Sequence, residues 1–120
     1  MSSIDTNSAA NSLVKHPFGP ATILAVVAAA VMAIETKNSK THVNISQLSS
    51  AATINATVHP EQAPGDTVLV KVSADATGRA LTFGTGFGAN PVTIAANKTF
   101  VIAFEFDGSV FRCTGALAQN

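Results

Sequence analysis

Residues 98–114 read Lys98-Thr-Phe-Val-Ile-Ala-Phe-Glu-Phe-Asp-Gly-Ser-Val-Phe-Arg-Cys-Thr114 and carry the clearest structural signal of the chain. Large apolar residues occupy every second position from Phe100 to Phe106, which is the period of a β-strand with one buried face. An Asp-Gly pair between such runs is the strongest short-range signal for a hairpin. We therefore predict two antiparallel strands joined by a two-residue turn at Asp107-Gly108.

A two-residue turn fixes which residues of the hairpin face each other. Phe104 would lie opposite Phe111 and Ile102 opposite Cys113, which gives one apolar, aromatic face for the core. Cys113 is then expected to be a small buried hydrophobe rather than a reactive thiol. It is the only cysteine of the chain, so an internal disulfide is excluded.

The composition describes a small, nearly uncharged protein. The 120 residues correspond to one domain, or to a domain with an arm, and their formal net charge is zero. Charged residues make up 12% of the chain, about half the usual share, while 47% of the residues are hydrophobic. A nucleic-acid partner is not expected, because it requires a basic surface. A neutral surface on so small a body predicts association with other chains, first of all with copies of itself.

Residues 1–20 differ from the rest of the chain. They are small and polar, show no hydrophobic period, and end in the sequence Pro17-Phe-Gly-Pro20. We interpret residues 1–20 as an N-terminal arm that docks on a neighbouring subunit, and residues 21–120 as a β-domain.

The apolar run Ala21–Ile34 has several interpretations. It is too short for a membrane span, which needs about 20 apolar residues, so no membrane partner is expected. A long preceding segment that contains Asp5 speaks against a signal peptide. Within a soluble domain the run is a helix or a buried strand, and its valines and isoleucines favour the strand. We prefer a hairpin of Val31–Glu35 with Thr41–Ile45 over a helix.

Strand patterns continue as far as the hairpin of residues 98–114, and residues 115–120 are expected to form a short, loose tail. Turn residues recur every eight to twelve residues, which is typical of a β-sandwich or a small barrel. We predict an all-β fold, a small antiparallel sandwich or barrel with an extended N-terminal arm. The further strands expected are residues 52–58, 67–72, 79–83 and 92–95.

The motifs that could support catalysis or ligand binding are weak. The glycines at 84, 86 and 88 form G-x-G-x-G without a following helix, so a nucleotide site is not expected. His16, His42 and His59 are too far apart in sequence to indicate a metal site. Glu105 and Asp107 would not meet as an acid/base pair, because one lies in a strand and the other in its turn. We expect no enzyme, no catalytic residue, no metal and no cofactor.

Phe87 is the residue that we single out for a partner contact. A large apolar side chain at the tip of the Gly-rich loop 84–91 is costly to expose and would suit an anchor in another protein. The alternative is that Phe87 folds back over the end of the domain. Phe18 in the arm is a second candidate contact.

Four short motifs occur in a recognisable order. They are Ala52-Thr-Ile-Asn55, Asp75-Ala-Thr-Gly-Arg79, Phe83-Gly-Thr-Gly-Phe87 and the Lys98-Thr to Asp107-Gly-Ser-Val-Phe111 stretch. In this order the chain resembles a group of small virion proteins from phages of Bacteroidetes-type hosts. The resemblance covers about residues 30–115 and leaves out the arm.

The resemblance implies a structural part of a phage particle. Such proteins are taken to be capsid decoration proteins, head fibres or spike bases, commonly trimeric, and the resemblance therefore implies a homotrimer in the virion that contacts the major capsid protein or another virion protein. The alanine-rich run 21–34 departs from the group's pattern. The alternative hypothesis is a host-surface-binding module of a tail or fibre tip, which would use the loop 84–91; the absence of Trp and Tyr speaks against sugar stacking.

Overall fold

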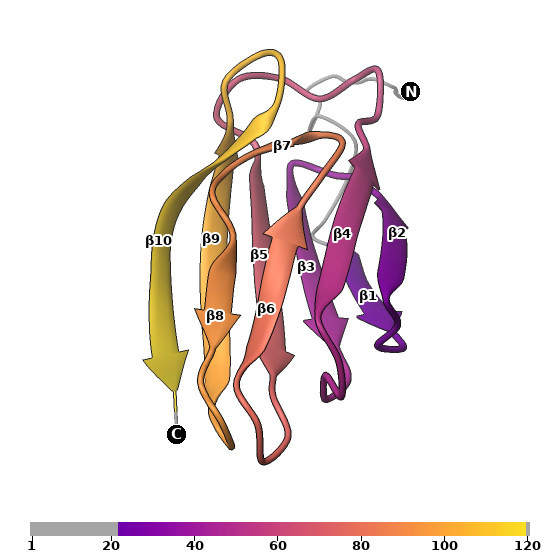
Figure 1. Cartoon of the computed structure of the whole chain (residues 1–120). Coiled ribbons are helices and arrows are strands. Elements are labelled where there is room, and N and C mark those ends of the chain that lie inside the picture. The colour runs from indigo at the N-terminus through magenta and orange to yellow at the C-terminus, as the bar shows by residue number, and fades with distance from the viewer. Residues whose placement is uncertain (1–21, 120) are drawn as a thin grey trace, which may run out of the picture.

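The computed structural model describes residues 22–119, which form ten β-strands and no helix (Figure 1). The all-β fold class predicted from the sequence is confirmed. The expected arm, residues 1–20, lies outside the described residues. The strands are β1 (Thr22–Val26), β2 (Val31–Glu35), β3 (Lys40–Ile45), β4 (Ala52–Thr57), β5 (Thr67–Ser73), β6 (Arg79–Phe83), β7 (Phe87–Gly88), β8 (Val92–Ile94), β9 (Thr99–Phe106) and β10 (Phe111–Gln119).

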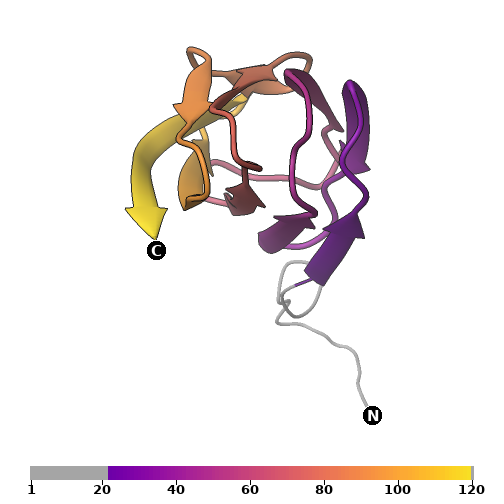
Figure 2. The ribbon, with the colours of Figure 1, turned by 60° about the horizontal axis from the view of Figure 1, so that its bottom comes forward.

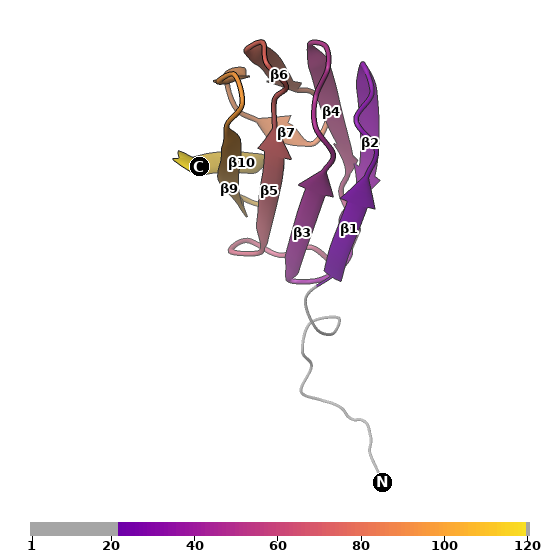
Figure 3. The same ribbon diagram turned by 90° about the horizontal axis from the view of Figure 1, so that it is seen from below.

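The strands form two sheets, and the chain winds between them. A six-stranded sheet has the order β1-β3-β5-β9-β10-β7, and a four-stranded sheet has the order β2-β4-β6-β8. Three successive coils, β1–β2, β3–β4 and β5–β6, each contribute one strand to either sheet. Within each sheet these strands pair in parallel. Residues 22–83 therefore form a short β-solenoid, whose two layers Figure 3 shows from below.

The prediction of an antiparallel sandwich or barrel was wrong for this part of the chain. Strand Val31–Glu35 exists with the predicted bounds, but β2 and β3 belong to different sheets and do not form a hairpin. The segment between them crosses from one sheet to the other at Thr36, which is 1% exposed. Thr36 N donates to the carbonyl oxygen of Thr57 over 3.1 Å, and its hydroxyl accepts from His59 N over 3.1 Å. These bonds tie the corner at Thr36 to the next coil and so favour parallel stacking.

The final third of the chain reverses direction and closes the stack. β9 is antiparallel to β5 and to β10, and β8 is antiparallel to β6. The predicted hairpin of residues 98–114 is confirmed, but its register differs by two residues. Phe106 faces Phe111, and Phe104 faces Cys113.

The difference in register comes from a longer turn. Residues 107–110 form the loop, with Asp107 N donating to the carbonyl oxygen of Val110 over 3.1 Å. The Asp107 carboxylate accepts from Ser109 N and Val110 N over 2.8 and 3.0 Å. Asp107 therefore organises four residues rather than two. A shift by an even number leaves Phe104 and Phe111 on the inner face, as the alternation required.

The core lies between the two sheets and is centred on five phenylalanines. The ring centroids of Phe83, Phe87 and Phe104 are 4.9–5.5 Å apart, and those of Phe106 and Phe111 are 4.9 Å apart. Such tilted ring pairs stabilise a core beyond the area that they bury. The three coils, together with β8 and β9, supply aliphatic neighbours that are fully or almost fully buried, namely Met32, Ile34, Val43, Ile45, Ile54, Val68, Val70, Val72, Leu81, Ile94 and Ile102.

At Gly86 the loop between β6 and β7 passes close to the backbone of β4. Its φ is +85°, and a Cβ built there would lie 2.4 Å from the carbonyl oxygen of Ala56. The carbonyl of Gly86 accepts from Phe111 N over 2.9 Å. The glycine thus allows the chain to pass from β6 to β7 directly over β4.

We predict that Gly86→Ala lowers the free energy of unfolding by roughly 2 kcal/mol or more, because backbone strain and a clash with Ala56 act together. Gly65→Ala is the matched control. Gly65 has φ +98° but nothing within 4 Å of a built Cβ, so strain alone should cost about 1 kcal/mol. Urea unfolding of both variants measures the difference, and equal losses would show that the close approach to Ala56 does not matter.

Candidate functional site: the open ends of the strand stack

The first coil leaves one end of the stack open. β1 and β2 are edge strands of their sheets, and each pairs with one neighbour only among the described residues. We call residues 22–35 the first-coil end. Three of its large apolar side chains are strongly exposed, with Ile23 at 67%, Val27 at 83% and Val31 at 67% of their full accessible area. Large apolar side chains gathered at a sheet edge are typical of an interaction surface.

Strand alternation places these side chains. Leu24, Val26, Met32 and Ile34 point between the sheets and pack on the core. The residues between them must then point outward or lie in the turn, whatever their polarity. The turn is fixed to the next coil, because Ala28 N donates to the hydroxyl of Ser46 over 2.8 Å. The first-coil end is therefore held in a defined conformation by the next coil.

The opposite end of the six-stranded sheet is formed by β10. Phe111 is fully buried, but every residue from Arg112 to Ala118 is exposed. β7 pairs only with Phe111 and Arg112, so the outer edge of β10 is open from residue 113 onward. We call residues 112–118 the β10 end. Figure 2 shows β10 bending away from the rest of the ribbon.

A shallow apolar hollow lies on the outer face of the β10 end. It is lined by Val101 and Ala103 of β9 and by residues 114–117 of β10. Leu117, opposite Val101 in the register, is 66% exposed. Together with the three side chains of the first-coil end, Leu117 completes the set of large hydrophobic residues that are exposed among the described residues.

The prediction that Cys113 is buried was wrong, because the residue is exposed. Its side chain has the same orientation as that of Phe111, towards the inner side of the sheet, as alternation requires. The six-stranded sheet, however, extends beyond the four-stranded one at this end, so the inner side of β10 has little to pack against. Burial of Cys113 would have needed an opposing strand.

The predicted partner contact Phe87 is also placed differently. Its side chain is only 8% exposed and packs on Phe83 and Phe104. Phe87 belongs to β7, which pairs with β10, and so covers the end of the core as the alternative interpretation held. Phe87 is therefore not an exposed anchor. The second candidate, Phe18, lies outside the described residues.

Sequence reasoning missed Ile23, Val27, Val31 and Leu117. A signal for them was present, because residues 17–34 and 113–120 contain no charged side chain. Natural proteins usually place lysines or other charges on a free sheet edge. Two uncharged runs at the two ends of a β-stack could have indicated surfaces that another chain covers.

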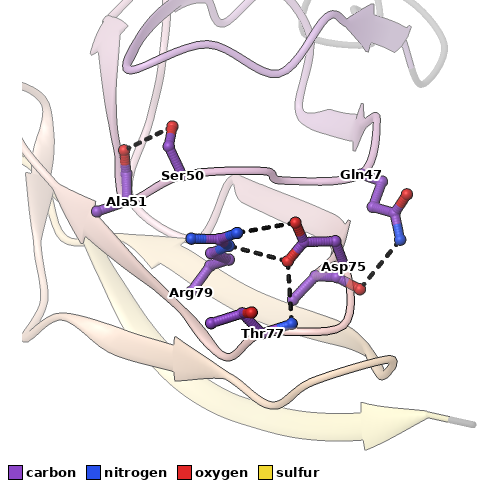
Figure 4. A network of polar contacts seen from close by, with 7 residues as sticks. Gln47, Ser50, Ala51, Asp75, Thr77 and Arg79 are labelled. Atoms are coloured by element: carbon purple, nitrogen blue, oxygen red, sulfur yellow. Dashed lines mark hydrogen bonds and ion pairs between the residues drawn. The ribbon is translucent and has the colours of Figure 1, made fainter.

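The described polar clusters fasten loops. Asp75 and Arg79 form a two-bonded ion pair, Oδ1 to Nε at 2.9 Å and Oδ2 to Nη2 at 2.8 Å, which holds the turn between β5 and β6 (Figure 4). The hydrogen bonds that Arg79 donates to the Asp75 carboxylate lower the pKa of Asp75 and raise the pKa of Arg79. The same carboxylate also accepts a hydrogen bond from Thr77 N over 3.1 Å, as the side chain of an aspartate at the start of a turn commonly does.

The remaining titratable candidates do not come together. His42 lies on β3 and His59 follows β4, while His16 lies outside the described residues. Within residues 22–119 no three His, Cys, Asp or Glu side chains are grouped closely enough to hold a metal ion. Over the same residues no helix is long and apolar enough to cross a membrane. We therefore take the two open ends, which carry the exposed large hydrophobic side chains of the described residues, as the candidate functional site.

Comparisons of the chain with protein-family models, with curated proteins and with solved structures found no match.

The contribution of Asp107 to stability should depend on pH. Hydrogen bonds from Val110 N, from Arg112 and from Ser109 N lower the pKa of Asp107 from 3.8 to about 2. Between these two pH values the unfolded chain binds more protons than the folded chain. The stabilisation by Asp107 is therefore complete above about pH 4 and is lost as the pH falls towards 2.

We predict that Asp107→Asn lowers stability at pH 7 and flattens the decline of stability between pH 4 and pH 2. Glu105→Gln is the matched control, because it removes a carboxylate from the neighbouring strand without touching the loop bonds. Urea midpoints measured across this pH range test the prediction. An Asp107→Asn curve parallel to that of the unaltered protein would contradict it.

Proposed function

We propose that the protein is a structural subunit of a phage virion, a capsid decoration or head-fibre protein that works as a homo-oligomer. The observation that supports this proposal most directly is the pair of open ends, which carry the large exposed apolar side chains and have Glu35 and Arg112 as their only charged residues. Such surfaces favour burial against another chain over solvation. The resemblance of residues 30–115 to small phage virion proteins gives the biological setting.

The mechanism of such a subunit is burial of apolar area. A standard protein interface buries about 800 Å² on each partner, and apolar area contributes roughly 25 cal/mol per Å². That driving force needs no charged groups, so it suits a chain with 12% charged residues. Within this proposal residues 1–20 form the arm that docks on the major capsid protein or on a neighbouring copy, and a trimer is the state that the resemblance implies.

The alternative, a host-surface-binding module, has less support. It relied on Phe87 as an anchor at the tip of the loop 84–91, and that side chain is part of the core. The rest of the loop consists of Gly84, Thr85, Gly86 and residues 88–91, which include no aromatic side chain. Stacking on a sugar ring would require one.

We predict that the full chain sediments as a single oligomeric species at micromolar concentration, with a mass of about three copies of the 12.2 kDa chain. Sedimentation velocity combined with native mass spectrometry measures that mass. A stable monomer at this concentration would remove the proposal.

The place of the protein in a particle is tested separately. Quantitative mass spectrometry of purified virions should find the protein at a fixed ratio to the major capsid protein. Phe18→Ala in the full chain should reduce its recovery with the particle, whereas Thr82→Ala, at an exposed mid-stack position, should not. Absence of the protein from purified particles would contradict the virion role.

A further inference from the structure

The two open ends of the stack match each other in strand direction. β10 is antiparallel to β9, and β9 is antiparallel to β5. β5 is parallel to β3, which is parallel to β1. β10 therefore runs in the same direction as β1. If β10 of one copy lay beside β1 of another, the pair would be parallel, like the pairs that build the three coils.

The exposed side chains of the two ends also lie on matching faces. Ile23 faces outward on β1, because its register partner His42 lies between the fully buried Thr41 and Val43. Leu117 faces outward on β10, because it lies opposite Val101 while the next residue, Ile102, is fully buried. In a sheet that continued from β10 into β1, both side chains would lie on the same outer face.

Charge places no obstacle to such a contact. Residues 17–34 include no charged side chain, and none follows Arg112. Arg112 itself is paired with Asp107 over 2.5 Å. Glu35, the one charged residue of the first-coil end, lies on β2 in the other sheet. Placing β10 beside β1 therefore brings neither like charges nor an unpaired charge between these two strands.

We propose that the β10 end of one copy binds the first-coil end of a second copy, head to tail, so that the six-stranded sheet continues from β10 into β1 of the next copy. This inference rests on the proposed self-association and adds the surface through which it occurs. One kind of contact then covers both open ends, whereas a two-fold contact through either end would leave the other open. A head-to-tail contact closes into a ring, such as a trimer, if its rotation allows.

Two substitutions, one at each end, test the inference. Ile23→Lys and Leu117→Lys each place a charge at the centre of one end, and each should raise the dissociation constant of the oligomer at least tenfold. Asn44→Lys is the matched control for the outer face, because Asn44 is exposed on β3, one strand in from the edge. Thr82→Lys is a second control, because Thr82 is exposed on β6 in the other sheet. Both controls should keep the oligomeric mass.

Mixing the two end variants gives the decisive result. Each variant retains one intact end, and the intact ends are complementary only if the contact is head to tail. Ile23→Lys and Leu117→Lys should therefore be monomeric alone and form a one-to-one dimer when mixed. Isotope labelling of one variant identifies that dimer in native mass spectrometry, and circular dichroism confirms that both variants keep their β-structure.

Every other pattern overturns the head-to-tail contact. Disruption by only one of the two substitutions would indicate a two-fold contact through that end. Disruption by both without a mixed dimer, or by either control substitution, would assign the interface elsewhere. If the unaltered protein is oligomeric and neither substitution changes its mass, the inference fails while the proposed function stands. A monomeric unaltered protein removes both.

Discussion

The backbone hydrogen bonds between successive coils are the constraint on which the whole structure depends. A strand in a parallel stack satisfies its peptide groups only through the coil before it and the coil after it. Corners such as Thr36, which bonds to Thr57 and His59 of the next coil, hold each coil in step with its neighbour. The arrangement works in the middle of the stack, but it leaves the first and the last strand with a partner on one side only.

The two ends of the stack differ in how their edge strands are covered. At the C-terminal end the chain reverses, and the antiparallel strands β9 and β10 with the phenylalanine cluster cover the core. At the N-terminal end the described chain begins directly with an edge strand that carries apolar residues on its outer side. Solenoids need terminal units with polar surfaces to remain soluble as single copies. The absence of charge from residues 17–34 fits a stack whose ends are covered by protein.

The sequence predicted where strands lie better than how they pair. The period of two in Val31–Glu35 and in residues 99–106 is a local property and gave strands with the same bounds. Whether β2 turns back beside β3 or crosses to the other sheet depends on contacts with Thr57 and His59, which lie more than 20 residues away. The burial of Cys113 was mispredicted for a related reason: alternation shows which way a side chain points, but only the extent of the facing sheet decides whether anything covers it. The open ends could have been suspected from the uncharged runs alone.

The spacing of the paired strands also sets an order for folding. β9 and β10 are joined by the four residues 107–110, whereas Thr22 pairs with Thr41 and Lys40 with Thr67. Closing a longer loop costs more chain entropy before any contact forms, so pairings between distant residues form more slowly than a hairpin. We expect the C-terminal hairpin to form first and to act as the template on which the coils are laid down in reverse order along the chain. Because the N-terminus is synthesised first, the N-terminal coils would then remain unpaired during translation until the C-terminal hairpin has been synthesised.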